Sequence, residues 1–271
     1  MAADPTAASS ITGHSDATMR PDASGVQRSD WSDALISIVF PAYQEETFLP
    51  TAIADVTKGL RSAGRHFEVL VVENGSKDRT REVALELAAE YPEVRALSIP
   101  AADYGLALRE GLLQSKGTFV VNFDVDLYDL TFLDRALERI AAPGGPSIVV
   151  ASKRGEDAND TRNWTRKAVT GVFTFLLRRG FGLKVSDTHG MKAMRRADVV
   201  PLAEQCLFGT DLFDTELVLR TERAGFLTGE IGVTIEETRP ARTPIAGRII
   251  RSVRGLAKLW FALRREARTK R

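Results

Sequence analysis

The stretch Leu35-Ile36-Ser37-Ile38-Val39-Phe40-Pro41 decides the fold class of this 271-residue chain. The run is short, apolar and rich in β-branched side chains, which is the pattern of a buried strand, and Pro41 is expected to end it. Polar residues follow at once in Tyr43-Gln44-Glu45-Glu46. We therefore predict a buried strand over 35–40 that opens into a polar loop.

Outward from this strand, strands and helices alternate along the chain. Further strands are expected at Phe67–Val72, Val94–Ile99, Phe119–Phe123 and Ser147–Ser152, and helices at Leu49–Ser62, Thr80–Glu90, Tyr104–Gln114 and Thr131–Ile140. This alternation predicts βαβ units, and so an α/β fold with a mostly parallel sheet and helices on both faces. Ligands of such sheets bind at the carboxyl ends of the strands.

We expect three parts in the chain. Residues 1–33 carry no apolar periodicity and are expected to be a disordered tail, because they cannot bury enough surface to offset their ordering entropy. Residues 34–246 form the α/β domain, in which Gly190–Arg195 is expected to be a short strand, Asp214–Ala224 a helix and Phe226–Ile235 an extended segment. Residues 247–271 are expected to form a basic amphipathic helix.

Composition narrows the class of partner and the compartment. Lys and Arg number 37 and Asp and Glu 36, so no strong overall field steers the molecule toward nucleic acid or a membrane. The single cysteine, Cys206, lies among apolar residues and is expected to be buried, and a chain without an internal disulfide is typical of a reducing compartment. No apolar run is long enough for a membrane span. A cytoplasmic location is expected, with peripheral attachment to the inner face of the plasma membrane as a further option.

Acidic and amide residues follow several of the predicted strands. Glu45 and Glu46 follow the first, Glu73-Asn74 the second, and Asp124-Val125-Asp126 the fourth. Two carboxylates one residue apart at the mouth of a buried strand can hold Mg²⁺ or Mn²⁺ together with phosphate oxygens. A solvated turn is the alternative for an isolated Asp-x-Asp, but the other acidic loops on the same edge favour the metal.

The chain resembles the family 2 glycosyltransferases of the GT-A fold. Among them it is most similar to the polyprenyl-phosphate sugar transferases that are like dolichol-phosphate mannose synthase. The resemblance rests on five stretches in order before and after the Asp-x-Asp: Pro41-Ala42-Tyr43-Gln44-Glu45-Glu46, Glu73-Asn74-Gly75-Ser76-Lys77-Asp78, Tyr104-Gly105-Leu106-Ala107, Val185-Ser186-Asp187-Thr188-His189-Gly190-Met191-Lys192 and Phe213-Asp214-Thr215-Glu216-Leu217. It implies inverting transfer of a sugar from a nucleoside diphosphate sugar by a metal-dependent hexosyltransferase.

The resemblance also implies a donor site. The residues expected to border the nucleotide are Pro41, Tyr43, Glu45 and Glu73. Asp124 and Asp126 are expected to hold the metal and the diphosphate, with Asp126 central to catalysis. Asn74 stands where the family has an aspartate, and its side-chain carbonyl can still accept a hydrogen bond from a base. Arg239 and Arg242 are candidates for the diphosphate, because a guanidinium binds phosphate bidentately.

The acceptor is less determined by the sequence. If it is a lipid phosphate, it arrives ionised, and the basic segment containing Arg154, Arg166 and Lys167 is expected to bind it. If it is a soluble or saccharide hydroxyl, a carboxylate base is required, and Asp187 and Asp214 are the candidates. A sugar-phosphate nucleotidyltransferase and a non-catalytic nucleotide-binding protein of the same fold stay as alternatives.

The basic C-terminal segment has two interpretations. The apolar residues Ile249, Val253, Leu256, Trp260 and Leu263 fall on one helical stripe. A basic amphipathic helix with a tryptophan is typical of a peripheral contact with an anionic membrane surface. The alternative is a helix whose stripe packs on the catalytic domain and whose basic face is solvated.

Overall fold

The computed structural model describes residues 31–152, 185, 188, 190–233 and 255–265. Along the chain the elements are η1 (Trp31–Asp33), β1 (Ile36–Ala42), α1 (Leu49–Ser62), β2 (Phe67–Asn74), α2 (Thr80–Glu90), β3 (Val94–Ile99), α3 (Tyr104–Gln114), β4 (Phe119–Asn122), α4 (Leu130–Ala141), β5 (Ile148–Ser152), β6 (Lys192–Arg195), α6 (Arg196–Glu204), η2 (Thr210–Leu212), α7 (Phe213–Arg223) and β7 (Thr228–Gly232). A further helix spans 255–265.

The strands form one seven-stranded sheet in the order β3-β2-β1-β4-β6-β5-β7. β1 pairs in parallel with β2 and β4, and β2 pairs in parallel with β3. β6 runs antiparallel to both β4 and β5, while β7 is parallel to β5. The predicted α/β class with a mostly parallel sheet is confirmed, and the short strand expected at 190–195 forms, although its antiparallel direction had no sequence signal.

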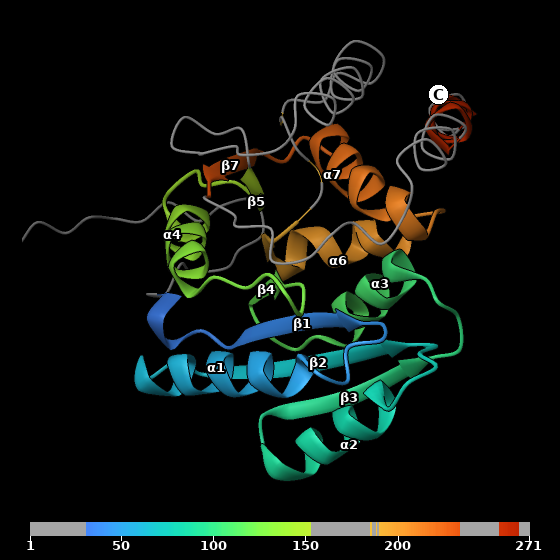
Figure 1. Ribbon diagram of the computed structural model, residues 1–271. Coiled ribbons are helices and arrows are strands. Elements are labelled where there is room, and N and C mark those ends of the chain that lie inside the picture. The colour runs from blue at the N-terminus through green and yellow to red at the C-terminus, as the bar shows by residue number, and fades with distance from the viewer. Residues whose placement is uncertain (1–30, 153–184, 186–187, 189, 234–254, 266–271) are drawn as a thin grey trace, which may run out of the picture.

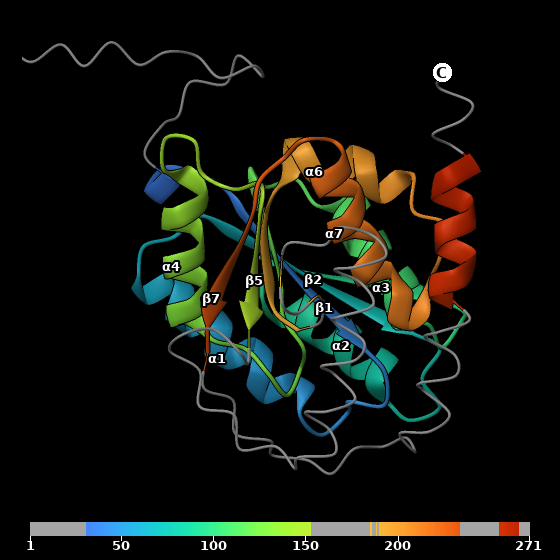
Figure 2. The same cartoon turned by 90° about the horizontal axis from the view of Figure 1, so that it is seen from above.

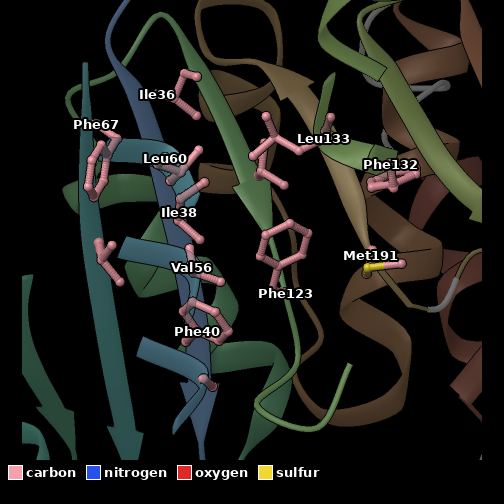
Figure 3. Close-up of a cluster of buried hydrophobic side chains, with 14 of the residues drawn as sticks. Ile36, Ile38, Phe40, Val56, Leu60, Phe67, Phe123, Phe132, Leu133 and Met191 are labelled. Carbon is pink, nitrogen blue, oxygen red and sulfur yellow. The ribbon is translucent and has the colours of Figure 1, made fainter. Parts of the chain in front are cut away.

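Helices cover both faces of the sheet (Figures 1 and 2). The side chains of α1, α2 and α4 pack on one face, and those of α3, α6, α7 and the helix over 255–265 pack on the other. Alternation along β1 sends Ile36, Ile38 and Phe40 to the first face and Val39 to the second. Figure 3 shows the first cluster, in which the Phe40 and Phe123 rings lie 5.9 Å apart.

Two boundaries differ from the expectation. β1 continues through Pro41 to Ala42 instead of ending at Phe40. Pairing of β1 with β4 ends at Val39, so Pro41 lies where only β2 is paired and its missing N–H is tolerated. The tail was expected to include residues 31–33, but Trp31 packs against the core, and the Arg65 guanidinium lies 4.0 Å from its ring centre.

The helix over 255–265 packs on the domain. Its buried residues Leu256, Leu259 and Leu263 belong to the second core cluster, and Gly255 lies close against Leu212. Of the expected apolar stripe, Leu256 and Leu263 therefore face inward, whereas Ile249 and Val253 lie outside the described residues. The described part of this helix therefore matches the alternative in which the apolar stripe packs on the catalytic domain. No helix in the described part of the chain is long and apolar enough to cross a bilayer.

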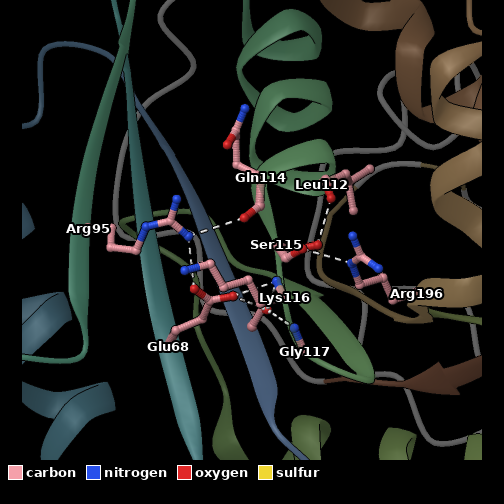
Figure 4. Close-up of polar contacts among 9 residues, drawn as sticks. Glu68, Arg95, Leu112, Gln114, Ser115, Lys116, Gly117 and Arg196 are labelled. Carbon is pink, nitrogen blue, oxygen red and sulfur yellow. Dashed lines mark hydrogen bonds and ion pairs between the residues drawn. The ribbon is translucent and has the colours of Figure 1, made fainter.

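A buried carboxylate holds the amino end of the sheet together (Figure 4). Glu68 on β2 accepts hydrogen bonds from Ser37 on β1 (2.7 Å) and from the backbone N–H of Lys116 (2.6 Å), which precedes β4. Its second oxygen pairs with Arg95 of β3 at 3.0 Å. One side chain thereby joins four successive segments of the sheet.

We expect Glu68→Ala to lower the free energy of unfolding by roughly 3 kcal/mol, because it leaves buried donors without an acceptor. Urea unfolding followed by circular dichroism measures the change. The matched control is Glu86→Ala, which removes the exposed Arg79–Glu86 ion pair and should cost less than about 1 kcal/mol. Equal losses for the two variants would contradict a structural role for Glu68.

Candidate active site

The carboxyl ends of β1, β2, β3 and β4 meet at one edge of the sheet, because these strands are parallel neighbours. The register places Ala42 beside Glu73 and Glu73 beside Ser98. The Glu73 carboxylate is buried and accepts hydrogen bonds from the Ser76 N–H and from the Ser98 hydroxyl, the latter at 2.6 Å. Glu73 thus lies at the edge, as expected, with both of its oxygens bonded within the protein.

The loops after β1 and β2 are joined to each other. Gln44 has a positive φ of 55°, and its N–H donates to Ser76 at 3.1 Å. The N–H of Glu45 donates to the Thr80 hydroxyl at 2.7 Å. Pro41, within β1, is buried, and Tyr43 in the loop is half-buried. Three of the predicted donor-site residues, Pro41, Tyr43 and Glu45, therefore lie in or just before the loop that is braced against the loop after β2, and Asn74 is the last residue of β2.

The Asp-x-Asp triplet forms a tight turn directly after β4. Asp124 and Leu127 exchange backbone hydrogen bonds of 3.1 and 2.9 Å, so Val125 and Asp126 occupy the corner of the turn. Val125 points into the core and Asp126 is exposed. The two carboxylates differ as a result, since Asp124 is half-buried against the sheet and Asp126 stands at the tip.

Asp124 is held from the side of α3. The Tyr104 hydroxyl donates to Asp124 Oδ1 at 2.9 Å and accepts from Asn122 Nδ2 at 3.2 Å. Asp124 Oδ2 takes no hydrogen bond from the described residues. Burial raises the pKa of Asp124 to about 6, although the Tyr104 hydrogen bond and the Lys192 charge oppose the rise.

A buried ion pair lies beside this group. Lys192 on β6 has no exposed surface, and its Nζ is 2.9 Å from Asp214 Oδ1 and donates to the Gly190 carbonyl at 2.8 Å. Asp214 is the second residue of α7 and is itself buried. The next residue, Thr215, shares a 2.9 Å hydroxyl hydrogen bond with Thr188. The start of α7 is therefore tied to the segment that leads into β6.

Sequence reasoning assigned no role to Tyr104, Asn122 or Lys192. The sequence does carry a signal for a buried role of Lys192. It lies between the apolar residues Met191 and Ala193 in the strand expected over 190–195, and a lysine buried there needs a counter-ion. Tyr104 and Asn122 had no such signal. The remaining predicted site residues lie outside the described part of the chain: Asp187, Arg239, Arg242, Arg154, Arg166 and Lys167. Cys206 is buried as expected, and burial raises the pKa of its thiol far above its ordinary value.

Residues 37–201, more than half of the chain, match the model of the family described as glycosyl transferase family 2. The chain belongs to this family. Its members are enzymes that transfer sugars, so this glycosyltransferase is an enzyme rather than a scaffold of the same fold. The nucleotidyltransferase alternative is set aside by the same match.

Relatives of this glycosyltransferase include enzymes named for lipid phosphates. It is 27% identical over 238 residues to the dolichyl-phosphate beta-glucosyltransferase ALG5A of Trichomonas vaginalis, covering 81% of this chain and 71% of the relative. It is 30% identical over 176 residues to the undecaprenyl-phosphate 4-deoxy-4-formamido-L-arabinose transferase of Pseudomonas paraeruginosa, covering 64% of this chain and 50% of the relative.

The fold of this glycosyltransferase is similar to that of glucosyl-3-phosphoglycerate synthase from Mycobacterium tuberculosis. The TM-score is 0.65 at 20% sequence identity, and the match covers 85% of this chain and 80% of the other. That enzyme was crystallised with Mn²⁺, uridine diphosphate and phosphoglyceric acid. The mannosyl-3-phosphoglycerate synthase of Rubrobacter xylanophilus gives a TM-score of 0.60, at 17% identity, and covers 87% of this chain and 75% of the other. The GT-A fold is thereby confirmed.

The donor atoms at the edge fit a hard divalent cation. Mg²⁺ and Mn²⁺ prefer carboxylate oxygens and need only one or two of them when phosphates complete the shell. Asp124 Oδ2 and the Asp126 carboxylate are of this kind. Among the described residues, no three His, Cys, Asp or Glu side chains converge to enclose a metal ion.

We expect Asp124→Asn to stabilise the metal-free protein at neutral pH. The folded-state pKa of about 6 lies above the ordinary 3.8, so ionising Asp124 costs stability as pH rises through this interval, and the cost is complete above it. Each pKa unit is worth about 1.4 kcal/mol, so at about pH 7.5 with EDTA the variant should gain on the order of 2 kcal/mol.

Urea unfolding at several pH values measures this difference, which should vanish near pH 4, where the wild-type side chain is largely protonated when folded. A variant that is less stable than the wild type at neutral pH would contradict the expectation.

Proposed function

We propose that this glycosyltransferase transfers a sugar, with inversion at C1, from a nucleoside diphosphate sugar to a polyprenyl phosphate at the cytoplasmic membrane surface. The observation that carries the proposal is the pair Asp124 and Asp126 at the carboxyl end of β4, with one carboxylate held by Tyr104 and the other exposed. The lipid-phosphate acceptors in the names of two relatives support the acceptor class.

In this proposal Asp124 Oδ2 and Asp126 hold Mg²⁺ or Mn²⁺ against the donor diphosphate. When bound, the cation neutralises the charge that builds up on the departing nucleoside diphosphate. The formal charges nearby agree with this, because the three carboxylates Asp124, Asp126 and Asp214 outnumber the single ammonium of Lys192 by two. A divalent cation balances that excess. Arg239 and Arg242 are proposed to meet the diphosphate.

The donor's nucleoside is proposed to lie on the loops after β1 and β2, among Pro41, Tyr43, Glu45 and Asn74. Asn74 Oδ1 is buried and has no hydrogen-bond partner among the described residues. A buried acceptor without a partner is costly, and a base N–H would satisfy it. Glu73 contributes by shaping this surface through Ser76 and Ser98. Uridine diphosphate, which a solved structure of similar fold contains, is the first nucleotide to test.

The acceptor phosphate is proposed to bind Arg154, Arg166 and Lys167. Its oxygen is already ionised at neutral pH, so it can attack C1 directly while the bond from C1 to the diphosphate breaks. A hydroxyl acceptor would need a base to take its proton.

We expect Asp126→Ala to reduce turnover at least about a thousandfold while leaving the melting temperature nearly unchanged, because Asp126 is exposed and its role is to hold the cation. The assay supplies UDP-glucose, Mn²⁺ and citronellyl phosphate, a short polyprenyl-type phosphate. The control, Glu138→Gln, changes an exposed carboxylate of α4 and should leave turnover unaltered.

Full activity of Asp126→Ala at saturating Mn²⁺ would refute the metal assignment. Efficient transfer to a soluble hydroxyl acceptor and none to the lipid phosphate would refute the acceptor class and leave the family assignment intact.

The membrane contact is proposed to use the outer face of the helix over 255–265. Since its leucine stripe is buried in the domain, the lipid-facing set consists of Lys258, Phe261, Arg264 and Arg265, all of which are exposed. Phe261 is 66% exposed, and Arg264 lies 3.5 Å from the ring centre of Trp260. Basic side chains around an aromatic one suit an anionic bilayer surface.

We expect the variant Phe261→Ser with Arg264→Glu and Arg265→Glu to lose most of its binding to vesicles of anionic phospholipid in co-sedimentation, because both the apolar and the cationic contacts are removed. Wild-type binding should weaken with added salt. Leu85→Ser, which changes a 56%-exposed apolar side chain on α2, is the control. Unchanged binding of the triple variant would contradict this surface.

A further inference from the structure

The start of α3 is fixed by contacts on both sides of Tyr104. Asp103 caps the helix, and its Oδ1 also accepts the N–H of Thr210 at 2.6 Å. Gly105 leaves no room for a side chain, because a Cβ there would lie 2.6 Å from the Cβ of Phe213. The Tyr104 ring packs against the second core cluster. The Tyr104 hydroxyl is therefore positioned by packed elements.

The direction of the hydrogen bonds around this hydroxyl follows from its partners. An ionised carboxylate only accepts, and a phenol has a single proton to give. The proton therefore goes to Asp124 Oδ1, 2.9 Å away, and the Tyr104 oxygen accepts from Asn122 Nδ2 at 3.2 Å.

This arrangement leaves one atom of Asn122 unsatisfied. With Nδ2 turned toward Tyr104, the buried Oδ1 has no hydrogen-bond partner in the part of the chain that the structure describes. Protein interiors seldom leave a buried acceptor in this state. Asn122 thus bears the cost of an unpaired oxygen while its amide holds the Tyr104 hydroxyl in place.

We infer that Tyr104, oriented by Asn122, is a positioning residue that leaves Asp124 a single oxygen for the cation and thereby favours Mg²⁺ or Mn²⁺ over Ca²⁺. This inference rests on the proposed function, in which Asp124 and Asp126 hold the cation. It assigns the choice of metal ion to a side chain that is not itself a ligand.

The physical reason is the way in which these ions use carboxylates. Mg²⁺ demands a compact octahedral shell, whereas Ca²⁺ takes more oxygens at longer distances and often binds both oxygens of one carboxylate. Mn²⁺ also suits an octahedral oxygen shell. A carboxylate with one oxygen bonded to a phenol can chelate Ca²⁺ only after that bond breaks. Tyr104 therefore opposes the mode of binding that favours the larger ion.

The test is Tyr104→Phe, which keeps the ring and removes the hydroxyl. Dissociation constants are measured in the presence of UDP, for Mn²⁺ from the electron paramagnetic resonance of the free ion and for Ca²⁺ by competition. The ratio of the Ca²⁺ constant to the Mn²⁺ constant should fall by about tenfold, since one hydrogen bond no longer opposes chelation. A hydroxyl that only supports the fold would affect both ions alike, and an unchanged ratio would overturn the inference.

Asn122→Leu is the second variant. It removes the amide donor at similar volume and leaves Tyr104 in place, so the ratio should fall by less than in Tyr104→Phe. An unchanged ratio here would overturn the role of Asn122, and would overturn the whole inference if Tyr104→Phe does not fold. Melting temperatures in EDTA check folding, and Tyr104→Phe should melt roughly 5 °C below the wild type.

The matched control is Tyr128→Phe. The Tyr128 hydroxyl also donates to a carboxylate, that of Asp55 at 2.8 Å, and Tyr128 lies in the same stretch of chain after β4. Its loss should leave the ratio unchanged, and a shift as large as that of Tyr104→Phe would contradict a specific role for Tyr104.

The same measurements separate this inference from the proposed function. A wild-type protein that binds no Mn²⁺ with UDP would refute the metal site and the inference together. If the wild type binds Mn²⁺ and Asp126→Ala does not, while Tyr104→Phe keeps the wild-type ratio, only the role of Tyr104 is refuted. None of these measurements requires an acceptor.

Discussion

Parallel pairing of β1 with β2 on one side and β4 on the other is the constraint from which the site follows. Strands that run the same way end at the same edge, and because the strand order reverses between β3 and β4, right-handed crossovers put α1 and α2 on one face and α3 on the other. Every chemically relevant loop of the first half therefore arrives at one place, although the loops are separated by tens of residues. The cross-bracing between the loops after β1 and β2, and the Tyr104 contact to Asp124, turn that edge into a defined surface.

The two sides of this edge of the sheet, one at β2 and β3 and the other at β6 and α7, differ in their polar contacts. On the side of β2 and β3, polar side chains such as Glu73 and Ser98 bond to one another and shape the loops. On the side of β6 and α7, the buried Lys192 ammonium pairs with the Asp214 carboxylate. The first arrangement braces the loop after β2. The second ties β6 to the start of α7.

The antiparallel strand β6 makes the second arrangement possible. Inserted between β4 and β5, it brings Lys192 next to Asn122, and the turn of chain before it meets the start of α7 through Thr188 and Thr215. The helix over 255–265 adds its leucines to the core cluster that also contains α7, and its exposed side is basic and aromatic.

The amino-acid sequence by itself determined the α/β class, the order of the elements, the carboxylates at the strand ends and the family, because apolar periodicity and the residues that follow each strand are local properties. Only the tertiary structure decided which way β6 runs, that the leucines near the C-terminus are buried in the core, and that Tyr104, Asn122 and Lys192 gather around Asp124 and Asp214. These depend on contacts between residues far apart in the chain. No local pattern records which distant partner will neutralise a buried charge or cover an apolar stripe.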